Sequence, residues 1–108
     1  MDQAKRPGRT EALKRINTMR KESRRRLTVH WRLRAKQRDF DEADFRAVCQ
    51  TGRIDDEGEW DDTHRNWKFR IVGYDVEHCE FIVVVGLADD ELILISGMRK
   101  VAGQWEEE

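Results

Sequence analysis

The residues best suited to do chemistry are His30, Arg34 and Arg38, which recur at four-residue steps. Histidine can move a proton near neutral pH, since its reference pKa is about 6.5. Arginine holds a phosphate because its planar guanidinium donates two parallel hydrogen bonds and stays charged. On a helix the three side chains would spread over about 80° of arc and could face one groove together. The alternative is structural, with His30 half buried in a helix and both arginines paired with the acidic residues 55–57.

Two further cations, Lys68 and Arg70, alternate with the apolar residues of the stretch 67–71. In a strand this alternation sends Arg70 to the face opposite the buried one. There it could hold a phosphate, or it could be a solvated residue of an antiparallel sheet. The arginine run at 24–26 has two similar interpretations, phosphate contact or the solvated end of a helix.

Motifs for metal or nucleotide chemistry are missing from the sequence. His78-Cys79 could be half of a metal site, but no second pair stands at zinc spacing. There is no Gly-rich phosphate loop, Walker motif or G-x-S-x-G, so nucleotide hydrolysis and acyl transfer have no support. We therefore expect no cofactor and no metal. Cys49 and Cys79 lack CxxC spacing, and we expect two reduced thiols in a cytoplasmic protein.

Charge is divided unevenly along the chain. Residues 1–38 contain 14 basic and three acidic residues, a net charge of +11, and the remainder carries −12. A basic half of this density is typical of a protein that binds a polyanion, either nucleic acid or an acidic protein. The alternative is internal, with the basic N-terminal helix lying against the acidic half. No run of about 18 apolar residues occurs, so we expect no membrane partner.

The N-terminal half predicts helices. Residues 10–26 should form a helix capped by Thr10, but its apolar stripe is thin, so we expect it to pack poorly on its own domain. The segment 27–40 is ambiguous, because it alternates like a strand while Thr28 could cap a helix. Residues 41–44, three of which are acidic, then open a short helix that ends at Gly52. Its expected buried residues are Phe45, Val48 and Cys49.

The C-terminal half predicts an antiparallel sheet. A first edge strand and a loop should precede a half-exposed strand at 67–72. The runs at 81–85 and 92–95 are continuously apolar and rich in β-branched residues, which is typical of strands covered on both faces. Tight polar turns join the three strands, so we expect a meander with the 81–85 strand in the sheet interior. The fold class is therefore α+β, with N-terminal helices followed by an antiparallel β-meander whose one face the helices cover.

Several features stand in a fixed order along residues 27–100. The His30-x3-Arg34-x3-Arg38 spacing is followed by Phe40, an acidic helix opening at Glu42, and Gly52 before an Ile-Asp-Asp strand. This order resembles the domain-of-unknown-function family 4258. The chain departs from the family pattern at Arg38-Asp39-Phe40, where Arg-Gly-Ile is usual. It departs again at Ser96-Gly97-Met98-Arg99, which is one residue longer than the usual Ser-Ala-Arg.

The last three strands also resemble those of BrnT toxins, which have a RelE-like ribonuclease fold. The matching positions are Ile71 to Gly73, Ile82 to Val85 and Ile93 to Arg99. The resemblance implies a RelE-like toxin fold, a helix at about 28–38, and a functional arginine at Arg99. The RNA-cleaving site would then consist of His30, Arg34, Arg70 and Arg99. The residues expected to bind nucleic acid are Arg24, Arg25, Arg26, Arg38 and Lys68.

The leading hypothesis is a bacterial toxin-type domain that cleaves or binds RNA without a metal. Its expected partners are RNA, on the ribosome or free, and an antitoxin protein. It would comprise a basic extension with a helix (1–26), a toxin-like domain (27–100) and an acidic tail (101–108). The alternative is a non-catalytic interaction protein of a phage or mobile element, which docks on an acidic partner through its basic N-terminal helix.

Overall fold

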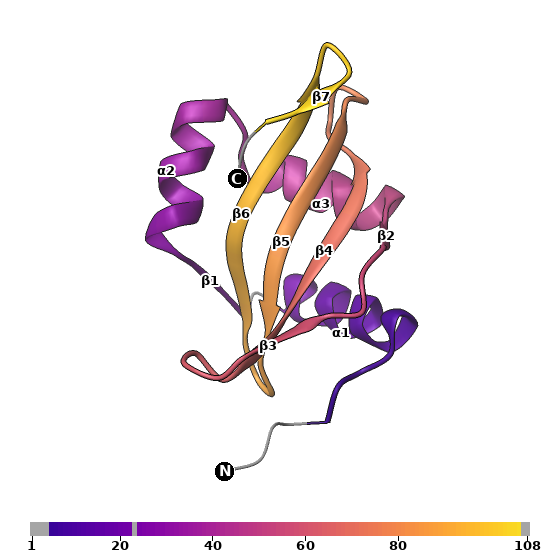
Figure 1. Cartoon of the computed structure of the whole chain (residues 1–108), viewed down its shortest axis with the longest axis vertical. Coiled ribbons are helices and arrows are strands. Elements are labelled where there is room, and N and C mark those ends of the chain that lie inside the picture. Colours follow the sequence, from indigo (N-terminus) through magenta and orange to yellow (C-terminus); the bar gives the residue numbers. More distant parts are fainter. Residues whose placement is uncertain (1–4, 23, 107–108) are drawn as a thin grey trace.

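A computed structural model describes residues 5–22 and 24–106 of the chain. Three helices and seven strands make up these residues (Figure 1). The helices are α1 (Arg9–Lys21), α2 (Val29–Arg38) and α3 (Glu42–Thr51). The strands are β1 (Arg25–Leu27), β2 (Arg53–Ile54), β3 (Glu59–Asp61), β4 (Asn66–Tyr74), β5 (Glu80–Leu87), β6 (Leu92–Val101) and β7 (Gln104–Trp105).

The centre of the sheet is the meander that the sequence predicted. Strands β4, β5 and β6 pair antiparallel in sequence order, with β5 in the middle. The sheet is extended by β1, which pairs parallel to β6, and by the short strands β2 and β3 on β4 and β7 on β6. Ile82 and Val84 are buried on the face away from the core, where they pack with Met98. The β5 run is therefore covered on both faces, as its composition indicated.

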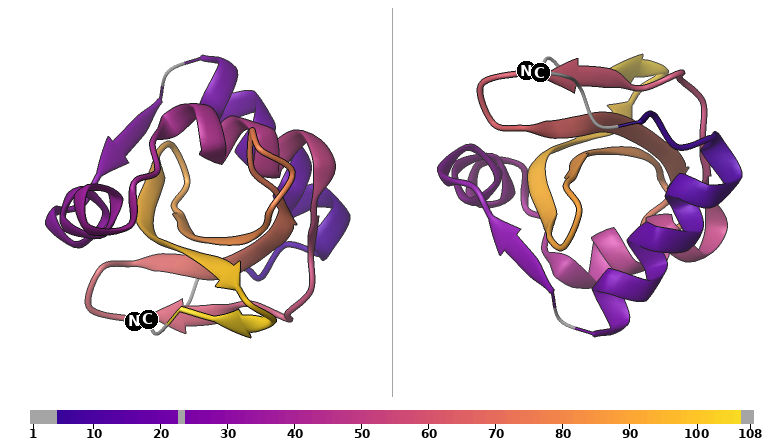
Figure 2. Two further views of the ribbon diagram at one scale, coloured as in Figure 1. Left: turned by 90° about the horizontal axis from the view of Figure 1, so that it is seen from above. Right: turned by 90° about the horizontal axis from the view of Figure 1, so that it is seen from below.

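The sheet is strongly curved, and α1 and α3 lie on its concave side (Figure 2). The main core fills the space between these helices and the strands. Its largest fully buried side chains include Phe45, Phe69, Phe81, Ile16 and Ile71. Helix α2 runs along the β6 side of the sheet, beside β1 (Figure 1). Among the described residues, no helix covers the outer face of β6.

Local signals explain where α2 and α3 begin. The Thr28 hydroxyl accepts a hydrogen bond from the backbone N–H of Trp31, which decides the ambiguous segment in favour of a helix. Asp41 and Asp44 form a reciprocal capping box at the start of α3. As predicted, α3 buries Phe45, Val48 and Cys49, and Gly52 follows its last residue, Thr51, as the C-cap.

The expectations for the N-terminal helix were partly wrong. Helix α1 starts at Arg9 with Gly8 as its N-cap, so Thr10 is not the cap, and it ends at Lys21. Residues 25–27 are not helical but form β1. The apolar stripe is thin, yet Ala12, Ile16 and Met19 are all buried in the main core. Because the stripe is continuous with the rest of the core, α1 is a structural part of the fold and not a loosely attached extension.

The two cysteines of the described residues are free, as expected. Cys79 is exposed, whereas Cys49 is buried, and burial raises the pKa of its thiol to about 12 although Arg20 acts in the opposite direction. A thiol with so high a pKa stays protonated and unreactive at neutral pH.

The end of the described chain is held on the sheet. Trp105 belongs to β7, and the Glu106 carboxylate accepts a hydrogen bond from the backbone N–H of Arg99 at 2.7 Å. The part of the predicted acidic tail at 107–108 lies outside the described residues. No helix in the described ranges is long and apolar enough to cross a membrane.

Candidate functional site

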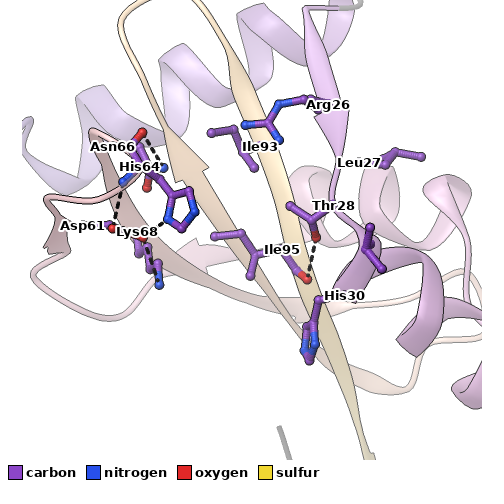
Figure 3. A pocket seen from close by; sticks show the side chains of 11 residues that line it. Arg26, Leu27, Thr28, His30, Asp61, His64, Asn66, Lys68, Ile93 and Ile95 are labelled. Atoms are coloured by element: carbon purple, nitrogen blue, oxygen red, sulfur yellow. Dashed lines mark hydrogen bonds and ion pairs between the residues drawn. The ribbon is translucent and has the colours of Figure 1, made fainter.

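A groove with a volume of about 480 Å³ lies on the outer face of β6 (Figure 3). Ile93 and Ile95 form its apolar floor. The end of β1 and the first turn of α2 form one side, and the β3–β4 hairpin forms the other. The side chains here that can carry charge or move a proton are Arg26, His30, Asp61, His64 and Lys68. An apolar floor with a few polar groups around it is the usual form of a small-ligand site.

His30 is held at the groove by the way α2 begins. The hydroxyl of Thr28 caps the helix and also donates to the carbonyl oxygen of Leu94 in β6 at 2.9 Å. Trp31 is buried and packs edge-on against Phe40, with ring centroids 5.0 Å apart. Successive helical residues are about 100° apart, so a buried Trp31 leaves His30 on the side that faces the groove. The His30 imidazole is thus positioned by the helix cap at Thr28, which precedes it in the sequence, and by the buried Trp31, which follows it.

His64 reaches the same groove from the turn between β3 and β4. Its Nδ1 lies 2.9 Å from a carboxylate oxygen of Asp61, and its backbone N–H donates to the other oxygen at 3.0 Å. The hydrogen bonds from the His64 side chain and then its backbone lower the pKa of Asp61 to about 2. Lys68 lies 3.4 Å from the same carboxylate. Asp61 is therefore ionised at neutral pH and orients both a histidine and a lysine.

Arg70 lies on the same sheet face as Lys68, two residues farther along β4. It is exposed while Phe69 and Ile71 are buried, so the predicted alternation is confirmed. Its guanidinium lies 3.6 Å from Asp55, in a neighbouring hollow that Lys68 also lines. His30 and Arg70 are therefore not on opposite faces of the sheet. They line two hollows that meet at Lys68.

Arg34 and Arg38 are not among the residues that line the groove. Arg34 donates to the side-chain oxygen of Gln37 at 2.9 Å, and Arg38 donates to the carbonyl oxygen of Gly97 at 2.9 Å. Helix α2 runs along β6, so these arginines follow the strand away from the groove while His30 stays at the N-terminal end. The regular spacing in the sequence does not bring the three side chains to one site.

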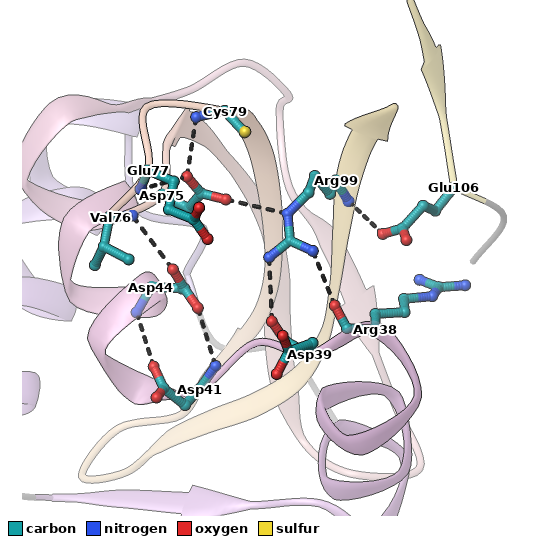
Figure 4. A network of polar contacts seen from close by, with 10 residues as sticks. All are labelled: Arg38, Asp39, Asp41, Asp44, Asp75, Val76, Glu77, Cys79, Arg99 and Glu106. Atoms are coloured by element: carbon teal, nitrogen blue, oxygen red, sulfur yellow. Dashed lines mark hydrogen bonds and ion pairs between the residues drawn. The ribbon is translucent and has the colours of Figure 1, made fainter. Parts of the chain in front are cut away.

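Arg99 lies in a separate polar network at the far end of α2 (Figure 4). Its guanidinium donates to the Asp75 carboxylate at 3.1 Å and to the carbonyl oxygen of Arg38 at 2.8 Å. The Asp75 side chain is only 1% exposed. The expectation that Arg99 shares a groove with His30 was wrong, because this arginine neutralises a buried acid and satisfies the carbonyl groups that end α2.

The three arginines at 24–26 are each paired with a carboxylate. Arg24 pairs with Glu22 at 2.6 Å and Arg26 with Glu91 at 3.1 Å, while Arg25 pairs with Glu42. The internal interpretation of the basic segment is therefore correct in part. Arg26 also lines the groove, and its ion pair is half exposed, so a phosphate could replace Glu91 at little cost.

Sequence reasoning missed His64. The Asp61-x2-His64 spacing is a usable local signal, because a turn can bring such a pair together. The sequence does not show that the hairpin then folds back beside β6. Only that long-range packing places His64 in the groove of His30, 34 residues away in the chain.

The architecture defines an α+β domain with a mostly antiparallel seven-stranded sheet in the described residues and a groove that contains two histidines. Residues 27–99 match the model of a family described as Domain of unknown function (DUF4258), and the chain belongs to this family. The match runs from the last residue of β1 to Arg99 in β6 and leaves α1 outside, although α1 completes the core. No curated protein and no solved structure gives a significant match to the chain.

Proposed function

We propose that the chain is a bacterial, cytoplasmic, toxin-type domain that binds and cleaves RNA in the groove between α2 and the β3–β4 hairpin. The observation that carries this proposal is the meeting of His30 and Lys68 in one hollow with an apolar floor. Lysine can hold and neutralise a phosphate, and histidine can move the proton that phosphodiester cleavage requires. The isoleucine floor provides an apolar surface for a nucleobase.

Charge supports RNA as the polyanion. Helix α2, which forms one side of the groove, contains no acidic residue and four basic ones after His30. Lys68 and Arg70 continue the positive surface along β4. A basic surface that leads to a groove increases the rate at which phosphates reach it. We infer that the phosphate backbone runs from the α2 side across Lys68 toward Arg70.

The substrate should be single-stranded. An RNA duplex keeps its bases stacked and paired, so turning one of its bases into the groove would require breaking these contacts. An unpaired base can turn toward Ile93 and Ile95 without the free-energy cost of breaking base pairs. Discrimination between single-stranded and double-stranded RNA therefore belongs to the proposal.

The fold is consistent with a relation to RelE-like and BrnT toxins, which we include in the proposal. The three segments that resemble BrnT, at 71–73, 82–85 and 93–99, lie on the three adjacent strands of one meander. The RNA-cleaving site would differ from the one expected from the sequence, because Arg99 has a structural role. Lys68 would instead be the cation that holds the phosphate near His30.

Cleavage of a labelled single-stranded RNA tests the proposal. His30→Ala should reduce the cleavage rate by about 10²-fold or more, since one proton-transfer group typically contributes that much. The melting temperature should stay unchanged. His78→Asn is the matched control, because His78 is exposed, lies outside the groove, and has a positive φ that asparagine tolerates. Equal rates for wild-type protein and His30→Ala would refute the role of the groove.

A second candidate function rests on the outer side of α2. Val29 is 82% exposed and Leu33 is 49% exposed, and the exposed residues Arg32 and Lys36 lie on the same helix. An apolar stripe beside basic residues fits an acidic amphipathic helix of a partner protein, as an antitoxin could supply. Such a helix would lie beside the groove, because Val29 lines its edge.

Co-expression with the product of an adjacent reading frame tests this candidate. Complex formation should be lost in Leu33→Asp and kept in Gln50→Asp. The second substitution also adds one negative charge, but at an exposed residue of α3. A complex that survives Leu33→Asp would show that the partner binds elsewhere.

A further inference from the structure

We propose that His64, oriented by Asp61, is a second proton-transfer residue that works with His30 on the same phosphodiester. This inference rests on the proposed function and adds a defined chemical reaction to it. Two of the three histidines of the chain line one groove. They stand on its opposite sides, with Ile95 between them (Figure 3).

The Asp61–His64 contact determines which nitrogen is available. The carboxylate lies 2.9 Å from Nδ1 of His64, so it accepts the Nδ1 proton and fixes the ring in one orientation. The Nε2 atom of the neutral ring then keeps its lone pair. Asp61 is only 15% exposed and is held by the His64 backbone N–H as well, so this support does not depend on a freely moving surface residue. The arrangement is that of a base with an orienting acid behind it.

Lys68 completes the arrangement. Its ammonium group lies 3.4 Å from Asp61, on the side of the hairpin that faces the groove. A phosphate between the two histidines would replace part of that ion pair and be neutralised by the lysine. The charged and titratable groups that face the groove are Arg26 from β1, His30 from α2, Asp61 from β3, His64 from the turn and Lys68 from β4.

The reaction that this arrangement supports is an internal transfer within RNA. His64 Nε2 removes the proton of a ribose 2′-hydroxyl, and the 2′-oxygen forms a bond to the adjacent phosphorus. The bond from phosphorus to the 5′-oxygen of the next nucleotide breaks, and protonated His30 gives its proton to that oxygen. The products are a 2′,3′-cyclic phosphate and a 5′-hydroxyl, and no metal, water or other reactant takes part in this step.

A purely structural role for the Asp61–His64 contact is the rival explanation. Three-residue contacts of this kind commonly stabilise turns, and His64 is mostly exposed. A structural role predicts that changes at His64 alter stability and leave the chemistry intact. The two explanations therefore separate when the cleavage rate, its pH profile and the affinity for RNA are measured on the same variants.

The test uses an oligonucleotide with one ribonucleotide in a deoxy background, together with its all-deoxy counterpart. The proteins are the wild-type chain, His30→Ala, His64→Ala, Asp61→Asn and the control His78→Asn. We expect a bell-shaped pH profile for wild-type cleavage, a cyclic phosphate product, and no cleavage of the all-deoxy strand. His64→Ala should lose at least about 10²-fold in rate with less than a threefold change in affinity for the all-deoxy strand. Asp61→Asn should bind at least as well, because a negative charge beside Lys68 is removed, and should cleave more slowly, because the ring loses its orienting charge.

The outcomes distinguish this inference from the proposed function. Cleavage that His30→Ala abolishes and His64→Ala leaves intact would overturn the role of His64 and keep the groove as the site. Cleavage of the all-deoxy strand would also overturn it, since the 2′-hydroxyl would not be the nucleophile. A wild-type chain that neither binds nor cleaves the oligonucleotide would refute the proposed function, and the inference with it.

Discussion

At the scale of single residues, the arginines of this chain divide into two groups. Arg99 is surrounded by protein groups, with a buried carboxylate on one side and the carbonyl groups that end α2 on the other. Arg26 and Arg70 have exposed ion pairs on the face that carries the groove. Residue type is the same in each case. Only the tertiary environment decides whether an arginine is used for stability or remains available to a phosphate.

Arg99→Met should therefore lower stability without changing the site. The substitution leaves the Asp75 carboxylate buried with no cation, which typically costs about 3 kcal/mol. Urea unfolding should show this loss in the free energy of unfolding. RNA cleavage per folded molecule should match the wild type. A stable Arg99→Met protein that fails to cleave RNA would show that Arg99 belongs to the RNA-cleaving site.

Asp61 makes the stability of the fold depend on pH, and the direction of that dependence follows from the pKa of its carboxyl group. An aspartate in the unfolded chain has a pKa of about 3.9, and the folded value is lowered to about 2. Its contribution to stability is thus present above pH 4 and is lost as the pH falls toward 2. Asp61→Asn should be less stable than wild type at pH 6, and the difference should shrink between pH 4 and pH 2. A difference that is constant with pH would show that the carboxylate charge contributes nothing.

At the scale of helices and strands, the sequence predicted the elements that depend on local residue patterns. The meander was predictable because residues 81–85 and 92–95 are continuously apolar runs, rich in β-branched residues and separated by a polar turn. The start of α3 was predictable because its capping residues are adjacent in the chain. Strand β1 was not, since Arg25–Leu27 is a strand only because it pairs parallel to β6, more than 60 residues away.

Helix α1 shows most clearly what the pattern of residues within one element cannot predict. Three buried residues make a narrow stripe, but the cations beside it are accommodated at the surface, where Arg9 pairs with Glu57 and Arg15 donates to the carbonyl oxygen of Ala88. Because these contacts are formed with distant loops, no count of apolar residues within the helix could reveal them. The docking of α1 was therefore underestimated.

Ile16→Ala tests whether α1 belongs to the core. Ile16 is fully buried, so the truncation should lower the free energy of unfolding by about 2–4 kcal/mol. Lys14→Ala is the matched control, because Lys14 is exposed on the same helix and should change stability by less than about 0.5 kcal/mol. Equal effects of the two substitutions would mean that α1 is detached from the sheet in solution.

At the scale of the whole molecule, the uneven charge has two uses. Part of the N-terminal basic excess is paired with the acidic half, as the contacts of Arg9, Arg25 and Arg26 show. Another part lies on α2, on one side of the groove, and Lys68 and Arg70 of β4, which belong to the acidic half of the sequence, lie on the other side. The sequence predicted a polyanion partner from this excess but not the groove, because the groove exists only where α2, β6 and the β3–β4 hairpin meet.

The most direct test of the account is to map where a single-stranded oligonucleotide binds. Isotope-labelled protein would be titrated with an all-deoxy strand, which the proposed chemistry cannot cleave, and the backbone amide signals followed by NMR. We predict that the largest changes cluster at 26–30, 61–68 and 93–95, the three segments that form the groove. Changes confined to α1 or to the outer side of α2, or no changes at millimolar strand, would contradict the central claim that this groove is an RNA site.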